Sequence, residues 1–269
     1  MMLDAHPELS IPPETHFVPQ VVRKLRPDFD RDRFVKLVAG HRRWGDFHLD
    51  PGDLRTRLDE DRAKGVGDAL RSFYLLYADG HGKSRFGDKT PRYLMNMRPI
   101  AKALPEAAFI HLLRDGRDVA LSKADRSGRP AAESAQLWRD RIAKARRQSR
   151  RLDTYLELRY EELVEDPEPN LRRVCEAIEL DFDPVMLRYH EGAGERLAEL
   201  GDAFRSEDDV RPAADRRAAH EMTTRPPERG RVARWRTEMP AADREAFERE
   251  AGELLAELGY PVGAAAQPQ

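Results

Sequence analysis

The sequence has 269 residues, a formal net charge of −2 at pH 7 and 36% charged side chains. This length is enough for one large domain with a buried core, and the balanced charge lacks the global basicity of nucleic-acid-binding proteins. No apolar run reaches the roughly 20 residues of a membrane span, and the N-terminus has no secretion-signal pattern. We therefore expect a cytoplasmic protein without a nucleic-acid or membrane partner. Cys175 is the only cysteine, which excludes an internal disulfide and a cysteine-rich metal site.

Two amphipathic helices are predicted in the first third of the chain. Apolar residues recur at helical spacing over Val21–Ala39 and again over Val66–Ala78. We expect residues 17–80 to form a helical region.

Strands alternate with helices in the middle of the chain. Ala107–Leu113 and Tyr155–Tyr160 have the short apolar pattern of buried strands. The segment Ala131–Leu152 between them predicts a long helix, and its arginine-rich face is that of a solvated surface. This order of strand, helix and strand is typical of an α/β protein.

The C-terminal third is predicted to be less regular. Residues 199–229 are poor in large apolar side chains and rich in Asp, Arg, Ala and Pro, which predicts a mobile surface loop. A final helix is expected over Ala241–Leu258, with Gly259 at its end. We expect a single domain over residues 1–262 and a disordered tail over residues 263–269.

The turn after the first of these strands carries the clearest functional signal. Arg114 lies where strand Ala107–Leu113 ends, and Ser122 lies about two turns into the helix that follows at once. Open α/β sheets bind ligands beyond the carboxyl ends of their strands, and a helix N-terminus offers free N–H groups to an anion. The pattern therefore predicts a phosphate- or sulfate-binding element.

Several separated segments, in this order, resemble the sulfotransferases that use 3′-phosphoadenosine 5′-phosphosulfate, above all the tyrosylprotein sulfotransferases and their bacterial relatives. Each motif alone is short, but all occur in the expected context of strand, turn and helix. The segments are residues 2–16, Phe86-Gly-Asp-Lys-Thr-Pro91, residues 114–122, residues 159–167, Gly230-Arg-Val-Ala-Arg-Trp235 and Leu258-Gly-Tyr-Pro261.

The resemblance implies a fold and an activity. The fold would be an α/β, three-layer domain like the P-loop NTPases, with a short, mainly parallel sheet and helices on both faces. The activity would be transfer of a sulfonate group from 3′-phosphoadenosine 5′-phosphosulfate to a hydroxyl or amine acceptor on a small molecule or peptide. No metal is required, because fixed Lys and Arg charges can stabilise the developing negative charge.

The resemblance also assigns roles to individual residues. Glu14 matches the family's general base, and Lys89 matches the cation that stabilises the transferred group and the leaving oxygen. His16 stands where the peptide-modifying enzymes carry an Arg that orients an acidic acceptor, so tyrosylprotein specificity does not follow. The expected nucleotide-binding residues are Arg114, Ser122, Arg126, Tyr160 and Arg234.

Other interpretations remain open from spacing alone. Glu14 also fits an exposed turn glutamate, Lys89 a solvated loop lysine and Arg114 a strand-end ion pair. Trp235 is expected to be a packing anchor rather than a ring stacked on adenine.

The family's first strand and its phosphosulfate-binding loop should lie just before residue 2, where this sequence starts. A start codon placed too far downstream or a genuine truncation would produce this pattern. A non-catalytic nucleotide-binding remnant and a P-loop kinase-like phosphotransferase are therefore the alternative functions. The sequence identifies neither the acceptor nor the oligomeric state.

Overall fold

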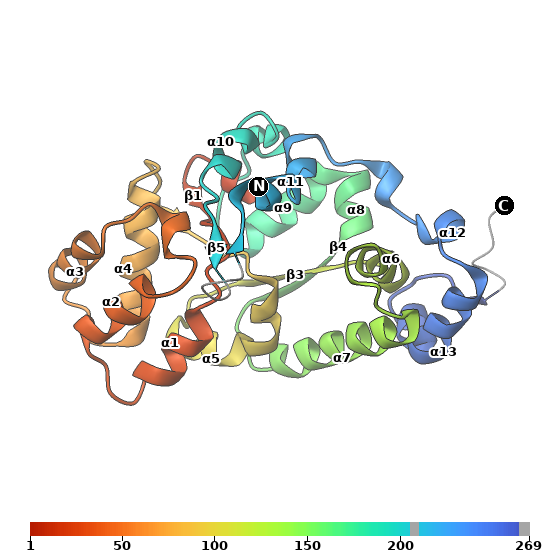
Figure 1. Cartoon of the computed structure of the whole chain (residues 1–269), viewed down its shortest axis with the longest axis horizontal. Helices are drawn as coiled ribbons and strands as arrows, with labels where there is room; N and C mark the ends of the chain where they lie inside the picture. Colours follow the sequence, from red (N-terminus) through yellow and green to blue (C-terminus); the bar gives the residue numbers. More distant parts are fainter. Residues whose placement is uncertain (205–209, 264–269) are drawn as a thin grey trace. The chain divides into compact units, whose positions relative to one another are not determined.

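The computed structural model describes residues 1–204 and 210–263, without the side chains of residues 125–127, 203–204 and 210–211. The chain divides into two compact units, each built from two segments (Figure 1). The first unit contains Met1–Ala107 and Leu180–Pro227, and the second contains Ala108–Glu179 and the segment that starts at Glu228. Each unit is described by itself below.

The first unit is mainly helical. Its two-residue strands β1 and β2 pair in parallel, whereas β5 and β6 pair antiparallel. Short 3-10 turns connect several of the helices. The elements are β1 (Leu9–Ser10), α1 (Val18–Leu25), α2 (Arg31–Ala39), α3 (Pro51–Glu60), α4 (Val66–Asp79), β2 (Arg85–Phe86), α5 (Met97–Ala103), α10 (Ala193–Ala198), β5 (Ala203–Phe204), β6 (Val210–Arg211) and α11 (Ala213–Ala218).

Aromatic side chains form the centre of the first unit. The ring of Phe73 on α4 meets Phe17 and Phe47 edge to face, with centroid separations of 5.3 and 5.2 Å. Phe17 is only 1% exposed. Because Phe17 directly follows the loop that precedes α1, its burial fixes the end of that loop.

The prediction of one helix over Val21–Ala39 is wrong. Helix α1 ends at Leu25 and α2 begins at Arg31. Pro27 lies between them and cannot continue a helix, because its ring removes an N–H donor and clashes with the preceding turn. The Asp30 side chain then caps α2 by accepting a hydrogen bond of 2.7 Å from the Arg33 N–H.

Residues 199–229 were predicted to form a mobile loop, and part of this range lies outside the described residues. The described part contains short strands, helix α11 and a 3-10 turn at Glu221–Thr224. Arg216 on α11 is buried and makes a two-pronged contact with buried Asp46, at 2.7 Å from each guanidinium nitrogen. Mobility of the segment stays a prediction.

The second unit combines a parallel strand pair with helices. Strands β3 (Phe109–Leu113) and β4 (Tyr155–Arg159) pair in register from Phe109 opposite Tyr155 to Leu113 opposite Arg159. The predicted strands, the long helix and the final helix are confirmed within a few residues. The helices are α6 (Gly116–Ser127), α7 (Ala131–Ser149), α8 (Tyr160–Glu165), α9 (Pro167–Ala177), α12 (Trp235–Glu238) and α13 (Ala241–Glu257).

The first turn of α6 is seated on α7 and α13, which run side by side (Figure 1). A Cβ atom at Gly116 would lie 2.5 Å from the Phe247 ring and 2.7 Å from the Trp138 ring. Only glycine allows this approach, so the packing of two distant helices fixes where α6 begins.

The α/β class with short, mainly parallel strand pairing is confirmed. Among the described residues the strands form separate two-stranded ladders, β1–β2, β3–β4 and β5–β6, rather than one continuous sheet. The single domain over residues 1–262 stays a prediction.

Candidate functional site

The loop between β1 and α1 is held by a buried hydroxyl network. Thr15 is fully buried, and its hydroxyl donates to the Asp88 carboxylate at 2.6 Å. Its backbone N–H donates to the Thr90 hydroxyl at 3.1 Å. The Tyr93 hydroxyl lies 2.6 Å from the Thr15 hydroxyl and accepts from the Val18 N–H at 3.1 Å. These bonds join the loop to the segment that carries Lys89.

Asp88 organises both segments. It accepts a second hydrogen bond, of 2.7 Å, from the Tyr74 hydroxyl on α4. Burial raises the pKa of Asp88, although the hydroxyl donors Thr15 and Tyr74 act in the opposite direction. Asp88 therefore joins the loop before α1 to helix α4.

On either side of Thr15, the side chains of Glu14 and His16 meet each other and Lys89. The Lys89 ammonium lies 2.6 Å from one Glu14 carboxylate oxygen, and His16 Nε2 lies 3.0 Å from the other. Burial acts to raise the pKa of Glu14, but the hydrogen bond from His16 and the charge of Lys89 outweigh it and lower the pKa to about 2. The structure thus brings three predicted site residues into one cluster.

The backbone of His16 is unusual. Its φ angle is +58°, in the left-handed region that residues other than glycine rarely adopt. Buried residues on both sides, Thr15 and Phe17, hold it in this conformation. Such local strain persists where the surroundings determine the backbone, often at functional sites.

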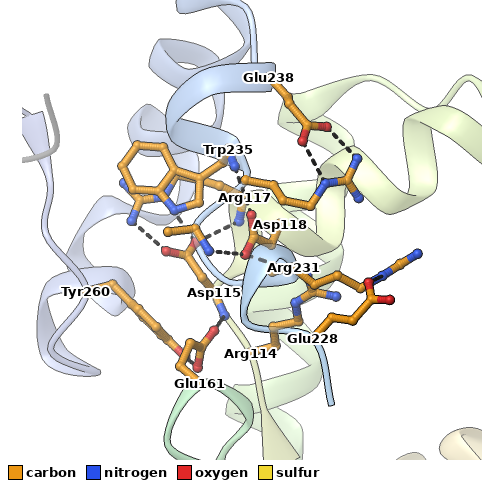
Figure 2. Close-up of polar contacts among 12 residues, drawn as sticks. Arg114, Asp115, Arg117, Asp118, Glu161, Glu228, Arg231, Trp235, Glu238 and Tyr260 are labelled. Carbon is orange, nitrogen blue, oxygen red and sulfur yellow. Dashed lines mark hydrogen bonds and ion pairs between the residues drawn. The ribbon is translucent and has the colours of Figure 1, made fainter. Parts of the chain in front are cut away.

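In the second unit, Arg114 lies at the end of β3 as predicted (Figure 2). Its guanidinium stacks over the Tyr160 ring, 4.7 Å from the ring centroid, and donates to the Arg231 carbonyl at 2.7 Å. The Asp118 carboxylate lies 3.6 Å from Nη2 of Arg114, the atom that donates to this carbonyl. The buried Nε atom has no hydrogen-bond partner among the described residues. A cation with an unused, buried donor is suited to a bound anion.

Arg117, in the same turn, is completely buried. It contacts Asp115 and Glu248 at 2.7 Å each and donates to the Pro261 carbonyl at 2.8 Å. Its guanidinium lies 3.5 Å from the centroid of the Trp235 ring. Figure 2 shows Arg117 enclosed by Asp115 and Trp235. Arg117 therefore has a structural role, and Trp235 is a packing anchor as expected.

Two carboxylates fasten neighbouring segments to this turn. Asp118 accepts hydrogen bonds of 2.9 Å from the backbone N–H groups of Ala233 and Trp235, and burial raises the pKa of Asp118. Glu161 accepts from the Asp115 N–H at 2.8 Å and from the Tyr260 hydroxyl at 3.0 Å. The turn is thus tied both to α8 and to the C-terminal segment.

The remaining predicted nucleotide residues are less defined. Ser122 is half-buried on α6, and the side chain of Arg126 on the same helix lies outside the described residues. Arg234 pairs with Glu238, at 2.9 Å through Nε and by a second bond through Nη2. The nucleotide contacts of these residues, and the catalytic roles of Glu14 and Lys89, stay predictions.

The sequence did not reveal the supporting roles of Thr15, Tyr74 and Tyr93. Thr15 lies 73 residues before Asp88 and 78 residues before Tyr93, separations over which no local pattern shows a contact. A weak signal existed for Tyr74, because a tyrosine on the buried face of a helix needs a polar partner for its hydroxyl.

Within residues 1–204 and 210–263, no group of three His, Cys, Asp or Glu side chains is placed to hold a metal ion. Over the same part of the chain, no helix combines the length and the apolar character needed to cross a membrane.

Residues 1–184 match the model of the sulfotransferase family. The chain belongs to this family. It is 27% identical to protein-tyrosine sulfotransferase 1 of Danio rerio over 208 residues, which cover 72% of this chain and 52% of the relative. It is also 24% identical to protein-tyrosine sulfotransferase A of Caenorhabditis elegans, over 78% of this chain and 53% of the relative. The chain thus spans about half the length of these curated relatives.

A structural comparison supports the same fold. The sulfotransferase domain of the Synechococcus PCC 7002 olefin synthase superposes with a TM-score of 0.57 at 23% identity, covering 97% of this chain and 89% of that one. The predicted P-loop NTPase-like fold is therefore confirmed.

The prediction of a cytoplasmic protein is wrong. The protein-tyrosine sulfotransferases to which this member of the family is similar are Golgi membrane enzymes.

Proposed function

We propose that this sulfotransferase-family protein transfers a sulfonate group from 3′-phosphoadenosine 5′-phosphosulfate to a hydroxyl or amine acceptor. The observation that carries the proposal, beyond family membership, is Arg114 with a buried, unused N–H donor at the end of β3. A charge-assisted hydrogen bond to a phosphate would satisfy that donor.

The residues of the second unit suit the nucleotide part of the donor. Arg114 would bind a phosphate while Tyr160 holds the guanidinium plane in place. Ser122 and Arg126 are positions of α6, the helix that begins at this turn. Arg234 directly precedes Trp235, whose N–H donates to Asp118. When bound, the donor supplies the activated sulfonate group, and these residues position it.

Residues of the first unit supply the groups that the transfer itself requires. Sulfuryl transfer resembles phosphoryl transfer, because an acceptor oxygen attacks while negative charge develops on the leaving phosphate. Lys89 would stabilise that charge, and Glu14, which contacts both Lys89 and His16, would take up the acceptor proton.

The acceptor class is broader than that of the named relatives. Those proteins are protein-tyrosine sulfotransferases, so a tyrosine hydroxyl is one candidate acceptor. His16 replaces the Arg expected for an acidic peptide, so a small-molecule hydroxyl or amine is equally compatible. The acceptor can be a small molecule or a peptide.

Calorimetric titration of adenosine 3′,5′-bisphosphate into the protein tests the nucleotide site. We expect binding by the parent and a loss of about 10- to 100-fold in affinity in Arg114→Ala, the size of one to two hydrogen bonds to a charged group. Arg147→Ala, which removes an exposed arginine from α7, is the matched control and should bind like the parent.

The outcomes separate the alternatives. Binding without sulfonate transfer to any hydroxyl or amine acceptor would favour a nucleotide-binding remnant. Binding of a nucleoside triphosphate with Mg²⁺ in place of the bisphosphate would favour a kinase-like phosphotransferase. Equal affinity in Arg114→Ala and the parent would refute the assignment of Arg114.

A further inference from the structure

Asp88 is connected to both side chains that the proposed transfer requires. It directly precedes Lys89, and its carboxylate accepts a hydrogen bond from Thr15, which directly follows Glu14. We propose that Asp88 is a positioning residue that holds Lys89 against Glu14. It acts as a hydrogen-bond acceptor for Thr15 and Tyr74, and its negative charge is not required for this role. The inference rests on the proposed function and adds to it a residue that acts through both reacting groups.

Thr15 is held by the residues on both sides of Lys89. Its hydroxyl donates to Asp88 at 2.6 Å, and its backbone N–H donates to the Thr90 hydroxyl at 3.1 Å. Consecutive Cα atoms are about 3.8 Å apart, so bonds to both flanking residues leave Lys89 little freedom to shift along the loop. Across this contact the Lys89 ammonium lies 2.6 Å from the Glu14 carboxylate. The bonds to Thr15 therefore set the register of the two reacting groups.

The directions of the hydrogen bonds follow from the number of hydrogens on each group. The Tyr93 hydroxyl accepts from the Val18 N–H at 3.1 Å and lies 2.6 Å from the Thr15 hydroxyl. A hydroxyl has one hydrogen and a carboxylate oxygen only accepts, so Tyr93 donates to Thr15 and Thr15 donates to Asp88. The Tyr74 hydroxyl donates to the same oxygen, Oδ2 of Asp88, at 2.7 Å. The series of bonds thus ends on one carboxylate oxygen.

The contacts of Asp88 use its shape and its acceptor oxygen rather than its charge. Within residues 1–204 and 210–263 no ion pair contains Asp88, and the adjacent Lys89 is paired with Glu14 instead. Burial raises the pKa of Asp88, and its Oδ1 atom is buried without a hydrogen-bond partner. An asparagine has the same shape and keeps one acceptor oxygen. It should therefore accept both hydroxyl bonds, with its NH₂ group in the place of Oδ1.

The buried groups, and not the lysine itself, provide the fixed reference for the pair. The side chain of Lys89 is 61% exposed, so its own surroundings do little to position it. Thr15, in contrast, is fully buried, and Tyr74 on α4 is 3% exposed. Asp88 links these two buried residues to the backbone of Lys89. A displacement of about 1 Å at a reacting group can lower the rate about 100-fold.

Helix α4 contains a matched pair of tyrosines for testing this network. Tyr74 and Tyr77 are both buried, at 3% and 1% exposure. Each donates its hydroxyl hydrogen to a carboxylate, Tyr74 to Asp88 at 2.7 Å and Tyr77 to Glu199 at 2.5 Å. Replacing either tyrosine by phenylalanine removes one such bond, but only the change at Tyr74 acts on Asp88.

The first experiment measures transfer of ³⁵S-sulfonate from labelled donor to a tyrosine-containing peptide. We expect kcat to fall about 100-fold in Asp88→Ala and to return to within about fivefold of the parent in Asp88→Asn. Affinity for adenosine 3′,5′-bisphosphate should be unchanged in both, because Asp88 contacts none of the residues assigned to the nucleotide. A kcat as low in Asp88→Asn as in Asp88→Ala would show that the charge is required and would overturn the proposal.

The tyrosine pair gives a milder test in which folding is less at risk. Tyr74→Phe should lower kcat about 10-fold, because Asp88 then keeps only the bond from Thr15. Tyr77→Phe should retain the parent kcat. Equal kcat values in the two variants would contradict a role for the hydroxyl network.

The pKa of Glu14 provides a readout that needs neither donor nor acceptor. The contacts with His16 and Lys89 lower this pKa to about 2, against the upward effect of burial. In Asp88→Ala the displaced Lys89 no longer acts on Glu14, so the pKa should rise toward the ordinary value of 4.5. The ¹³C shift of the Glu14 carboxyl, followed as the pH is lowered, measures this change. Asp88→Asn should keep the parent value.

A second carboxyl in the first unit shows that the effect is local. Arg71 lowers the pKa of Glu106, and this pKa should be the same in the parent and in Asp88→Ala. An unchanged Glu14 pKa in Asp88→Ala would refute the positioning role. Absence of both nucleotide binding and sulfonate transfer in the parent would instead overturn the proposed function.

Discussion

The two loops that contain most of the predicted site residues use charge in different ways. In the turn from Arg114 to Asp118, Arg117 is fully buried between carboxylates and a tryptophan ring. In the loop from Glu14 to His16, the partner cation Lys89 is 61% exposed. Neighbouring hydroxyl groups, rather than the charges, anchor that loop.

The difference shows that a basic motif need not consist of ligand-binding residues. The turn after β3 contains two arginines. Arg117 uses its donors in contacts with Asp115, Glu248 and Pro261, whereas Nε of Arg114 has no hydrogen-bond partner among the described residues. A buried ion pair fixes geometry, and an exposed one leaves its members available for chemistry. Substitutions should therefore affect stability strongly in the first case and weakly in the second.

Arg117→Ala should have the largest effect on stability. It leaves the carboxylates of buried Asp115 and half-buried Glu248 without their cation and should cost about 3–5 kcal/mol in the free energy of unfolding. Urea unfolding followed by circular dichroism measures this cost. Arg139→Ala, which removes a 43% exposed arginine that contacts Asp140, should cost about 1 kcal/mol or less. Equal losses of unfolding free energy in Arg117→Ala and Arg139→Ala would contradict the distinction between buried and exposed ion pairs.

Acid should have an intermediate effect through Glu14. Its pKa of about 2 in the folded protein lies below the ordinary value of 4.5, so its ionised form stabilises the fold above pH 4.5. That stabilisation is lost as the pH falls from 4.5 through 2. Because Lys89 is exposed, we expect a loss of about 1–2 kcal/mol. Urea unfolding of the parent and of Glu14→Gln between pH 6 and 2.5 should show a steeper decline for the parent; parallel curves would contradict the ion-pair assignment.

Lys89→Gln should have the smallest effect on stability and a large one on activity. An exposed ion pair contributes about 0.5 kcal/mol or less, so the unfolding midpoint should hardly change. Removing the cation that we propose to stabilise the transition state should lower kcat about 100-fold. Transfer of ³⁵S-sulfonate from labelled donor to a tyrosine-containing peptide measures kcat, and thermal unfolding measures the midpoint. Lys102→Gln, an exposed lysine on α5, should change neither.

Local pattern was sufficient to predict several elements of the second unit. The strand that ends at Leu113, the helix that follows Arg114 and the final helix each have their own periodicity and stop signals. The break between α1 and α2 was missed although Pro27 marks it, because apolar spacing continues on both sides. Proline and the Asp30 cap should have outweighed the periodicity.

Long-range partners account for what the sequence did not reveal at the site. The burial of Arg117 depends on Glu248 and Pro261, more than 130 residues away. The buried pair of Arg216 and Asp46 is separated by 170 residues and lies partly in a segment that composition alone marks as a loop. The resemblance to sulfotransferases identified Glu14, His16 and Lys89 as site residues, but it did not predict the contacts among them.

The burial of Arg117 also bears on the order in which the chain can fold. Its partners Glu248 and Pro261 are synthesised more than 100 residues after β3 and α6 are complete. Until those partners emerge from the ribosome, the Arg117 guanidinium has only Asp115 as an anionic partner, and the Phe247 ring does not yet pack against Gly116. The turn between β3 and α6 is thus completed only once residues 247–261 have been synthesised, a delay expected for contacts of such wide sequence separation.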